Sequence, residues 1–236
     1  MNKVFLTAAW RKLIMANYAI DANILKPYLP RHTELDIRDG TCYVSLVGFM
    51  FLNTRLKGIK IPFHADFEEV NLRFYVRFKD EGEWKHGAVF IKEIVPKPAV
   101  TFVANSVYGE KYETRPMKHE WMDDSFSQTV SYAWKKKKWN SIKVIADKQL
   151  LDLTTGSEVS FIAVQHWGLS KGRNQTTAKY SVEHPKWQMY ETIEAFIEVD
   201  FEDNYGPEFK FLNDLAPSCV FLVEGSDILI RNKQIM

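Results

Sequence analysis

The sequence predicts a mainly β domain of the α+β class, in which many strands and two or three short helices form a barrel or a sandwich. Three observations favour this fold. Alternating or continuous apolar segments recur along the chain and are separated by turn residues. Aromatic residues make up 14% of the chain, a share that favours strands and pocket walls. No repeat, linker or low-complexity segment interrupts residues 1–236, so one domain is the simplest interpretation.

Residues 67–77 form the strand around which we expect the rest to be organised, because successive side chains alternate in character. The apolar side carries Val70, Leu72, Phe74 and Val76, and the polar side carries Glu69, Asn71, Arg73, Tyr75 and Arg77. The polar side could face water, as in many surface strands. It could also line a pocket inside a closed or strongly curved sheet, and its mixture of acid, amide, guanidinium and phenol suits a pocket better than a solubility face.

The first half of the chain combines short helices with long strands. Apolar spacing predicts a helix over residues 4–17, followed by a short strand at 17–20. Asp21 is a plausible N-cap for a short helix through Tyr28. Asp39 and Gly40 form a tight turn that leads into a long strand over 41–52, apolar on both faces and therefore central.

The second half is expected to be further antiparallel sheet. Pro98 and Gly109 bracket a short buried helix over 98–108, with a strand as the alternative because several of its residues are β-branched. The candidate strands are 87–95, 111–117, 125–134, 139–146, 158–166, 176–182 and 193–200. Residues 168–174 read as a turn, and residues 219–230 as a hairpin that reverses at Gly225 and Ser226.

Composition argues against several classes of function. A net charge of +1 gives no reason to expect a nucleic-acid or membrane partner, and Lys135–Lys138 reads as a solvated turn. Cys42 and Cys219 lie in separate apolar runs and are expected to be free thiols. The histidines lack metal-ligand spacing, and there is no nucleotide-binding glycine loop or nucleophile elbow, so we expect neither a metal nor a cofactor. No signal peptide or membrane span is evident, which predicts a soluble, cytoplasmic protein.

Two groups of residues could carry chemistry. On the polar side of the organising strand, Glu69 and Arg73 could clamp a carboxylate ligand with help from Asn71 and Tyr75, or form a structural ion pair. The second group follows the predicted helix and consists of Tyr108, Lys111, Tyr112 and Glu113. A desolvated Lys111 could form a Schiff base with a carbonyl compound, although an exposed loop lysine is the simpler interpretation.

Several motifs together resemble the YqjF-like family of uncharacterised proteins over nearly the whole chain. They are Trp10, Asn17-Tyr18, Leu29-Pro30, Gly40 with residues 43–49, residues 67–76, Tyr108-Gly109, residues 184–187 and Pro217-Ser218. That family looks like a distant branch of the acetoacetate decarboxylase superfamily. The resemblance implies a curved, barrel-like antiparallel sheet with a central pocket, and often homo-oligomers.

In the decarboxylases a lysine after a Gly-aromatic-Pro turn attacks the substrate ketone, a second lysine lowers its pKa, and a pocket glutamate and arginine assist. The resemblance places Glu69 at that glutamate and Gly109 at the turn. The proline and the lysine pair are absent, and Tyr112 stands at the position of the nucleophile with Glu113 beside it. Lys111 is one residue early, which in a strand points it to the opposite face. Glu110 and Glu113 are also expected to raise the pKa of Lys111, the wrong direction for an amine nucleophile.

The sequence therefore leaves three functional hypotheses open. The leading hypothesis is a protein that binds or converts a small anionic keto or carboxylate compound. Its catalytic candidates are Glu69, Lys111 and Tyr112, and its ligand-binding candidates are Asn71, Arg73, Tyr75, Tyr108 and Glu113. The alternatives are an active Schiff-base decarboxylase and a non-enzymatic interaction protein whose pocket is filled by side chains.

Overall fold

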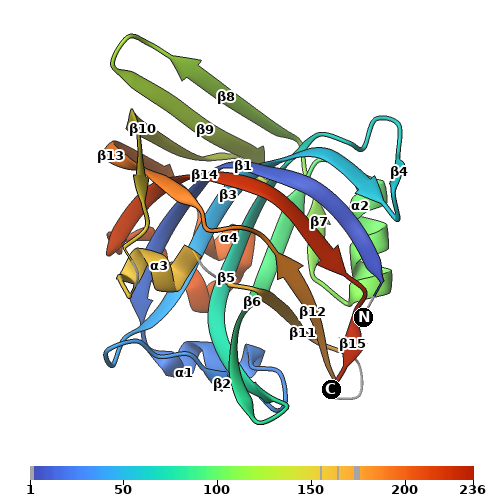
Figure 1. The fold of residues 1–236 in the computed structure, drawn as a ribbon. Helices are drawn as coiled ribbons and strands as arrows, with labels where there is room; N and C mark the ends of the chain where they lie inside the picture. The colour runs from blue at the N-terminus through green and yellow to red at the C-terminus, as the bar shows by residue number, and fades with distance from the viewer. Residues whose placement is uncertain (1–2, 155, 164, 173–175) are drawn as a thin grey trace.

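The computed structural model describes residues 3–154, 156–163, 165–172 and 176–236, and most of them lie in one strongly curved sheet (Figure 1). The strands are β1 (Val4–Ile20), β2 (Glu34–Leu35), β3 (Cys42–Leu56), β4 (Ile59–Lys60), β5 (Phe67–Asp80), β6 (Glu83–Val95), β7 (Tyr112–Thr114), β8 (Met117–Asp123), β9 (Ser127–Lys135), β10 (Trp139–Asp152), β11 (Trp167–Lys171), β12 (Thr177–Glu183), β13 (Gln188–Glu198), β14 (Cys219–Arg231) and β15 (Gln234–Ile235). The helical segments are α1 (Ala22–Leu25), η1 (Lys26–Tyr28), α2 (Pro98–Val103), η2 (Ala104–Tyr108), α3 (Glu158–Ala163), α4 (Phe201–Tyr205) and η4 (Pro207–Asn213).

The sheet closes on itself. Hydrogen-bonded neighbours follow the order β15-β12-β11-β6-β5-β3-β1-β14-β13-β10-β9-β8. In addition, β12 pairs with β14, where Val182 lies opposite Ile230 and Glu183 opposite Leu229. Strands β14, β1, β3, β5, β6, β11 and β12 thus form a closed ring, from which the β8–β9 hairpin projects (Figure 1). The sheet is mixed, because β6 runs parallel to both β11 and β7.

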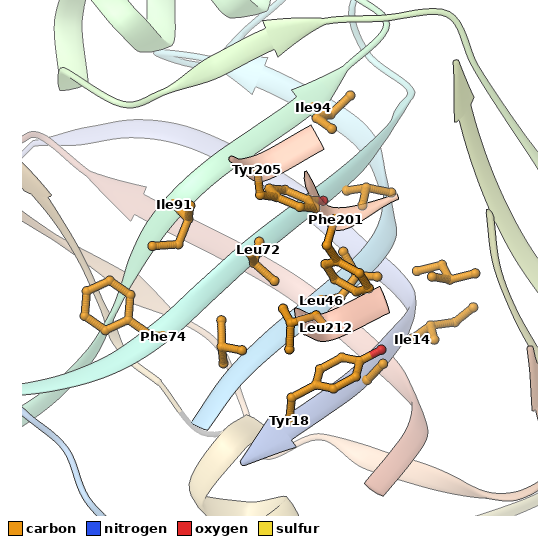
Figure 2. Close-up of a cluster of buried hydrophobic side chains, with 14 of the residues drawn as sticks. Ile14, Tyr18, Leu46, Leu72, Phe74, Ile91, Ile94, Phe201, Tyr205 and Leu212 are labelled. Atoms are coloured by element: carbon orange, nitrogen blue, oxygen red, sulfur yellow. The ribbon is translucent and has the colours of Figure 1, made fainter. Parts of the chain in front are cut away.

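The ring strands carry apolar side chains on their outward face, and α4, η4 and β9 pack against them. Figure 2 shows Ile14 and Tyr18 of β1, Leu46 of β3, Leu72 and Phe74 of β5, and Ile91 and Ile94 of β6 beneath Phe201, Tyr205 and Leu212 of α4 and η4. Tyr132 and Trp134 of β9 belong to the same cluster. A strand buried on both faces reads as a nearly continuous apolar run, which explains the composition of β3, confirmed as a central strand between β1 and β5.

The N-terminal segment is a strand and not the helix predicted over residues 4–17. It pairs with β14 on one side and β3 on the other along most of its length. The register against β3 shifts between Arg11 and Ile14, and Lys12 adopts a left-handed φ of 53°. This bulge inserts one residue into the alternation, so Trp10 and Leu13, which are three residues apart, face the same side, and this imitates helical spacing.

The hairpin predicted at Gly225 and Ser226 is also wrong, because β14 continues through it. Arg11 lies opposite Gly225, and the register between β1 and β14 does not shift from Leu6 to Asn17. Gly225 has a φ of 82°, and a Cβ there would lie 2.1 Å from the carbonyl oxygen of Trp10. The glycine marks a close approach of two backbones and not a reversal of the chain.

Other local predictions have mixed outcomes. The Asp21 cap is confirmed, since its carboxylate accepts a hydrogen bond from the Asn23 amide at 2.8 Å. The turn at Asp39 and Gly40 is confirmed. Residues 98–108 are helical, but Phe102 is 71% exposed, so this helix is not buried as predicted.

In the second half of the chain, residues 158–163 form α3 where a strand was predicted, and residues 167–171 form β11 where a turn was predicted. Residues 164, 173 and 174 of those two predictions lie outside the described residues. Cys42 and Cys219 are free thiols, as expected. The lysine run forms the β9–β10 turn, where Lys137 pairs with Asp203 at 3.0 Å. Among the described residues, no helix is both long and apolar enough to cross a membrane.

The close approach at Gly225 predicts a specific stability difference. Gly225→Ala adds both the strain of a positive φ and a collision with backbone, and we expect it to lower the free energy of unfolding by about 3 kcal/mol. Gly58→Ala is a matched control, because Gly58 has the same φ of 82° and, apart from its chain neighbours, no atom of the described residues lies within 4 Å of the place that its new methyl group would take. Only the strain of about 1 kcal/mol therefore applies to the control. Urea unfolding of both variants tests this, and equal losses would contradict it.

Candidate functional site

The interior of the ring contains two adjoining chambers. The inner chamber has a volume of about 60 Å³ and is lined from every strand of the ring. Representative lining residues are Trp10 (β1), Phe49 (β3), Glu69, Asn71 and Arg73 (β5), Glu93 (β6), Trp167 (β11), Tyr180 (β12) and Ile230 (β14). The polar side of the organising strand therefore faces inward, as the pocket interpretation of the sequence predicts.

Bulges in two strands bring extra side chains to the inner chamber. Residues three apart in a regular strand point to opposite faces. Trp10 and Leu13 nevertheless both line the chamber, because the bulge at Lys12 lies between them. Phe90 and Glu93 do so as well, because the register of β6 against β5 shifts by one residue between them. Each bulge thus re-aims one side chain toward the interior.

Glu69 is the central acid of the inner chamber and is only 2% exposed. Its carboxylate accepts hydrogen bonds from Asn71 Nδ2 at 3.0 Å and from the Tyr112 hydroxyl at 2.9 Å. Burial raises the pKa of Glu69 to about 7, although these two hydrogen bonds and the charge of Arg73 oppose the shift. A carboxyl group with a pKa near neutrality can either donate or accept a proton at physiological pH.

Two further buried acids accompany Glu69. Burial raises the pKa of Glu110 to about 8, with the Tyr180 hydroxyl opposing the shift and Glu69 adding to it. Burial and the neighbouring Glu110 and Glu69 raise the pKa of Glu93 well above its ordinary value. Near pH 6 these acids are therefore mostly protonated and neutral. No three His, Cys, Asp or Glu side chains within the described ranges are placed to share a metal ion.

Arg73 supplies the positive charge of the inner chamber. Its Nη2 donates to the carbonyl oxygen of Ile162 in α3 at 3.3 Å, and its guanidinium carbon lies 5.7 Å from the centre of the Tyr75 ring. The side chain is buried, yet in the described part of the chain its Nε has no hydrogen-bond partner. Glu93 Oε2 and Asn71 Oδ1 are likewise buried without a partner among the described residues. Unpaired buried polar groups of this kind are the places where a ligand or ordered water binds.

The outer chamber is larger, about 350 Å³, and mainly apolar. Its walls come from β1, β3, β5, β12 and β14, and α2 together with the loop containing Ile61 and His64 covers one end. Glu69, Tyr112 and Tyr180 line both chambers, so a single ligand can reach from one to the other.

The structure brings five of the eight residues proposed from the sequence to these chambers: Glu69, Asn71, Arg73, Tyr108 and Tyr112. The other three are Tyr75, Lys111 and Glu113, and they line neither chamber. Tyr75 is buried beside Arg73 with its hydroxyl 2.6 Å from Ser45 Oγ, so it supports the arginine. Glu113 forms ion pairs with Arg115 and Lys92.

Lys111 lies on the side of β7 opposite to Tyr112, as strand alternation predicts. It is an exposed residue, and its Nζ lies 5.0 Å from the centre of the Tyr28 ring. Partial desolvation and the charge of Lys171 lower the pKa of Lys111, whereas the sequence suggested a raised value. Glu110 and Glu208 do act to raise the pKa of Lys111, but desolvation and Lys171 outweigh them, and Glu113 pairs instead with Arg115 and Lys92.

Sequence reasoning did not select Glu93, Glu110 or Tyr180 for the site. The sequence does contain a signal for Glu93, which stands in the apolar end of β6. Because an unpaired acid is rarely buried without a function, its position indicates a site residue. Its face could not be assigned, since the bulge in β6 breaks the alternation. Glu110 and Tyr180 carry no comparable signal, because their positions depend on how the helix end and β12 meet the ring.

Comparison with known proteins places the chain in a family. Residues 7–227 match the family DUF2071, described as an uncharacterized conserved protein, and the chain belongs to it. The uncharacterized protein YqjF of Bacillus subtilis (strain 168) is 35% identical over 71 residues, which are 30% of this chain and 29% of that protein's length. The family predicted from the sequence is thereby confirmed.

Solved structures with the same fold are acetoacetate decarboxylase-like. The acetoacetate decarboxylase of Legionella pneumophila has a TM-score of 0.67 and 12% identity, with 98% of this chain and 87% of that chain covered. The enduracididine biosynthesis enzyme MppR, complexed with pyruvate, has a TM-score of 0.67 and 13% identity, with 100% and 91% covered. These likenesses confirm the predicted fold.

The raised pKa of Glu110 predicts how stability depends on pH. In the unfolded chain a glutamate titrates at about pH 4, so the penalty for ionising Glu110 is absent below that pH, grows as the pH rises, and is complete above the folded pKa of about 8. Glu110→Gln removes this penalty, and we expect its free energy of unfolding at about pH 9 to exceed that of the wild type by several kcal/mol. The exposed Glu120→Gln serves as the control. Parallel stability curves of wild type and Glu110→Gln from about pH 5 to 9, measured by urea unfolding, would contradict the burial of a titrating acid.

Proposed function

We propose that the protein binds a small carboxylate or keto-carboxylate compound in the inner chamber, with Arg73 as the anion anchor and Glu69 with Tyr112 placed to exchange a proton with it. The observation that carries this proposal is the buried guanidinium of Arg73, whose Nε lacks a partner among the described residues. A buried arginine pairs readily with a carboxylate, whose two oxygens match its donors.

The electrostatics of the chamber support an anionic ligand. With Glu69 and Glu93 protonated near pH 6, Arg73 makes the inner chamber net positive, and the protonated acids offer O–H groups from which a ligand carboxylate can accept hydrogen bonds. Burial and the surrounding acids raise the pKa of Tyr112 well above its ordinary value, so its phenol stays neutral and can donate to Glu69 or to the ligand. The acid and the phenol together suit general acid/base chemistry.

The likeness in fold agrees with this class of ligand, since the similar proteins include an acetoacetate decarboxylase and an enzyme complexed with pyruvate. A Schiff base is not part of the proposal, because Lys111 lines neither chamber. The hypothesis of a pocket filled by side chains is disfavoured by the two chambers. A cytoplasmic location and a homo-oligomer stay predictions from the sequence.

Arg73→Met tests the anion anchor. It keeps an unbranched side chain but removes the charge, and we expect the affinity for pyruvate to fall by about tenfold or more, because a charge-assisted hydrogen bond contributes about 1.5–3 kcal/mol. Arg77→Met is the control, since Arg77 lies on the same strand but is exposed and pairs with Glu34 at 3.0 Å. Isothermal titration calorimetry measures both. Unchanged binding in a folded Arg73→Met protein would contradict the proposal.

The affinity for an anion should also depend on pH. At about pH 6, below the raised pKa values of about 7 and 8, Glu69 and Glu110 are protonated and add no charge. At about pH 9 both are ionised, Glu69 in the inner chamber and Glu110 in the adjoining outer chamber, and their repulsion should weaken pyruvate binding by roughly tenfold or more. In Glu110→Gln the loss should be smaller and should centre near the lower of the two values. Pyruvate affinity that rises with pH, measured by calorimetry, would argue for a cationic ligand.

A further inference from the structure

The outer chamber suits a different part of a ligand from the anionic head that we propose for the inner chamber. Its walls include Phe5, Phe51, Phe67, Val100 and Ile230. Its polar side chains are Thr54, His64, the acids Glu69 and Glu110, and the phenols Tyr108, Tyr112 and Tyr180. An apolar wall of this extent gives no compensation for burying a polar group, so it selects an apolar one.

The volumes of the two chambers indicate how such a ligand divides. The outer chamber, about 350 Å³, is roughly six times as large as the inner chamber, about 60 Å³, so the small head of a ligand fits the inner chamber and the larger body of the ligand fits the outer one. A compound as small as pyruvate or acetoacetate would leave most of it unfilled.

The two chambers are placed to hold one molecule. Phe51 and Ile230 line both of them, as do Glu69, Tyr112 and Tyr180. Toward solvent the outer chamber ends at Ile61, which is 39% exposed, and at Ala99 in the first turn of α2. A molecule that enters between this loop and α2 would meet the apolar walls first and the acids last.

We infer that the ligand is an amphipathic carboxylic acid, with the carboxylate or keto-carboxylate head in the inner chamber and a medium-length aliphatic chain or an aromatic ring in the outer chamber. The inference rests on the proposed function for the head and adds the class of the tail. It places the selectivity for ligand length in residues of β1, β3 and α2, and the recognition of the acid in β5 and β7.

A series of straight-chain carboxylates from acetate to decanoate tests the inference by calorimetry at about pH 6, where the acids of the chamber are protonated. Each added methylene should tighten binding about fourfold, the equivalent of about 0.8 kcal/mol, until the outer chamber is full. If all chain lengths bind equally, the tail inference is overturned while the proposed function stands. If no acid binds, or if octanol binds as tightly as octanoate, the anionic head and hence the proposed function fail.

Val100→Trp should separate the tail from the head. Val100 lines the outer chamber, so an indole there should abolish the gain from octanoate over butanoate while butanoate still binds. Phe102→Trp is the matched control on the same helix, because Phe102 is exposed and does not line the chamber. Ala104→Leu, which fills the same space with a smaller group, replaces Val100→Trp if that variant does not fold. Wild-type preference for octanoate in a folded Val100→Trp or Ala104→Leu protein would overturn the inference.

Discussion

The pairing of β12 with β14 is the contact on which the site depends, because it closes the ring of strands around the two chambers. The two residues of one closing pair, Val182 and Ile230, themselves line the inner chamber. Closure removes the inward side of β5 from bulk water. Since desolvation disfavours the charged form of a carboxyl group, Glu69 and Glu110 hold their protons to about pH 7 and 8. An open sheet with the same residues would leave these acids hydrated and ionised.

Desolvation also decides what the chamber can bind. The three acids and one arginine of the two chambers would attract cations in water, but in the dry interior the acids are mostly neutral below pH 7 and Arg73 determines the sign of the charge. Where the decarboxylase resemblance places an amine, this chain has the phenol of Tyr112, hydrogen-bonded to Glu69. The fold is shared with an acetoacetate decarboxylase and with an enzyme complexed with pyruvate, and a shared fold does not by itself establish a shared reaction. The chemistry that we propose for this site is proton transfer beside an anchored anion.

Several features of the fold were accessible from sequence because they depend on neighbouring residues. The polar and apolar faces of β5, the cap at Asp21 and the turn at Gly40 all follow from patterns that span a few positions. The errors fall where tertiary pairing overrides such patterns. The bulge at Lys12 made β1 resemble a helix, and the positive φ of Gly225 made a continuous strand resemble a hairpin. In both places a second strand satisfies the backbone, and nothing in the local sequence specifies that strand.

The sequence by itself determined the family and the mainly β fold. It also determined that Glu69, Asn71 and Arg73 share one face of a strand, because strand alternation has a period of two that is visible in the chain. It also excluded Lys111 from the face of Tyr112 by the same rule. Only the tertiary structure decided that this face is dry and that Glu93, Glu110 and Tyr180 join it. The physical reason is that burial and proton affinity are properties of the closed ring, which residues far apart in the chain build together.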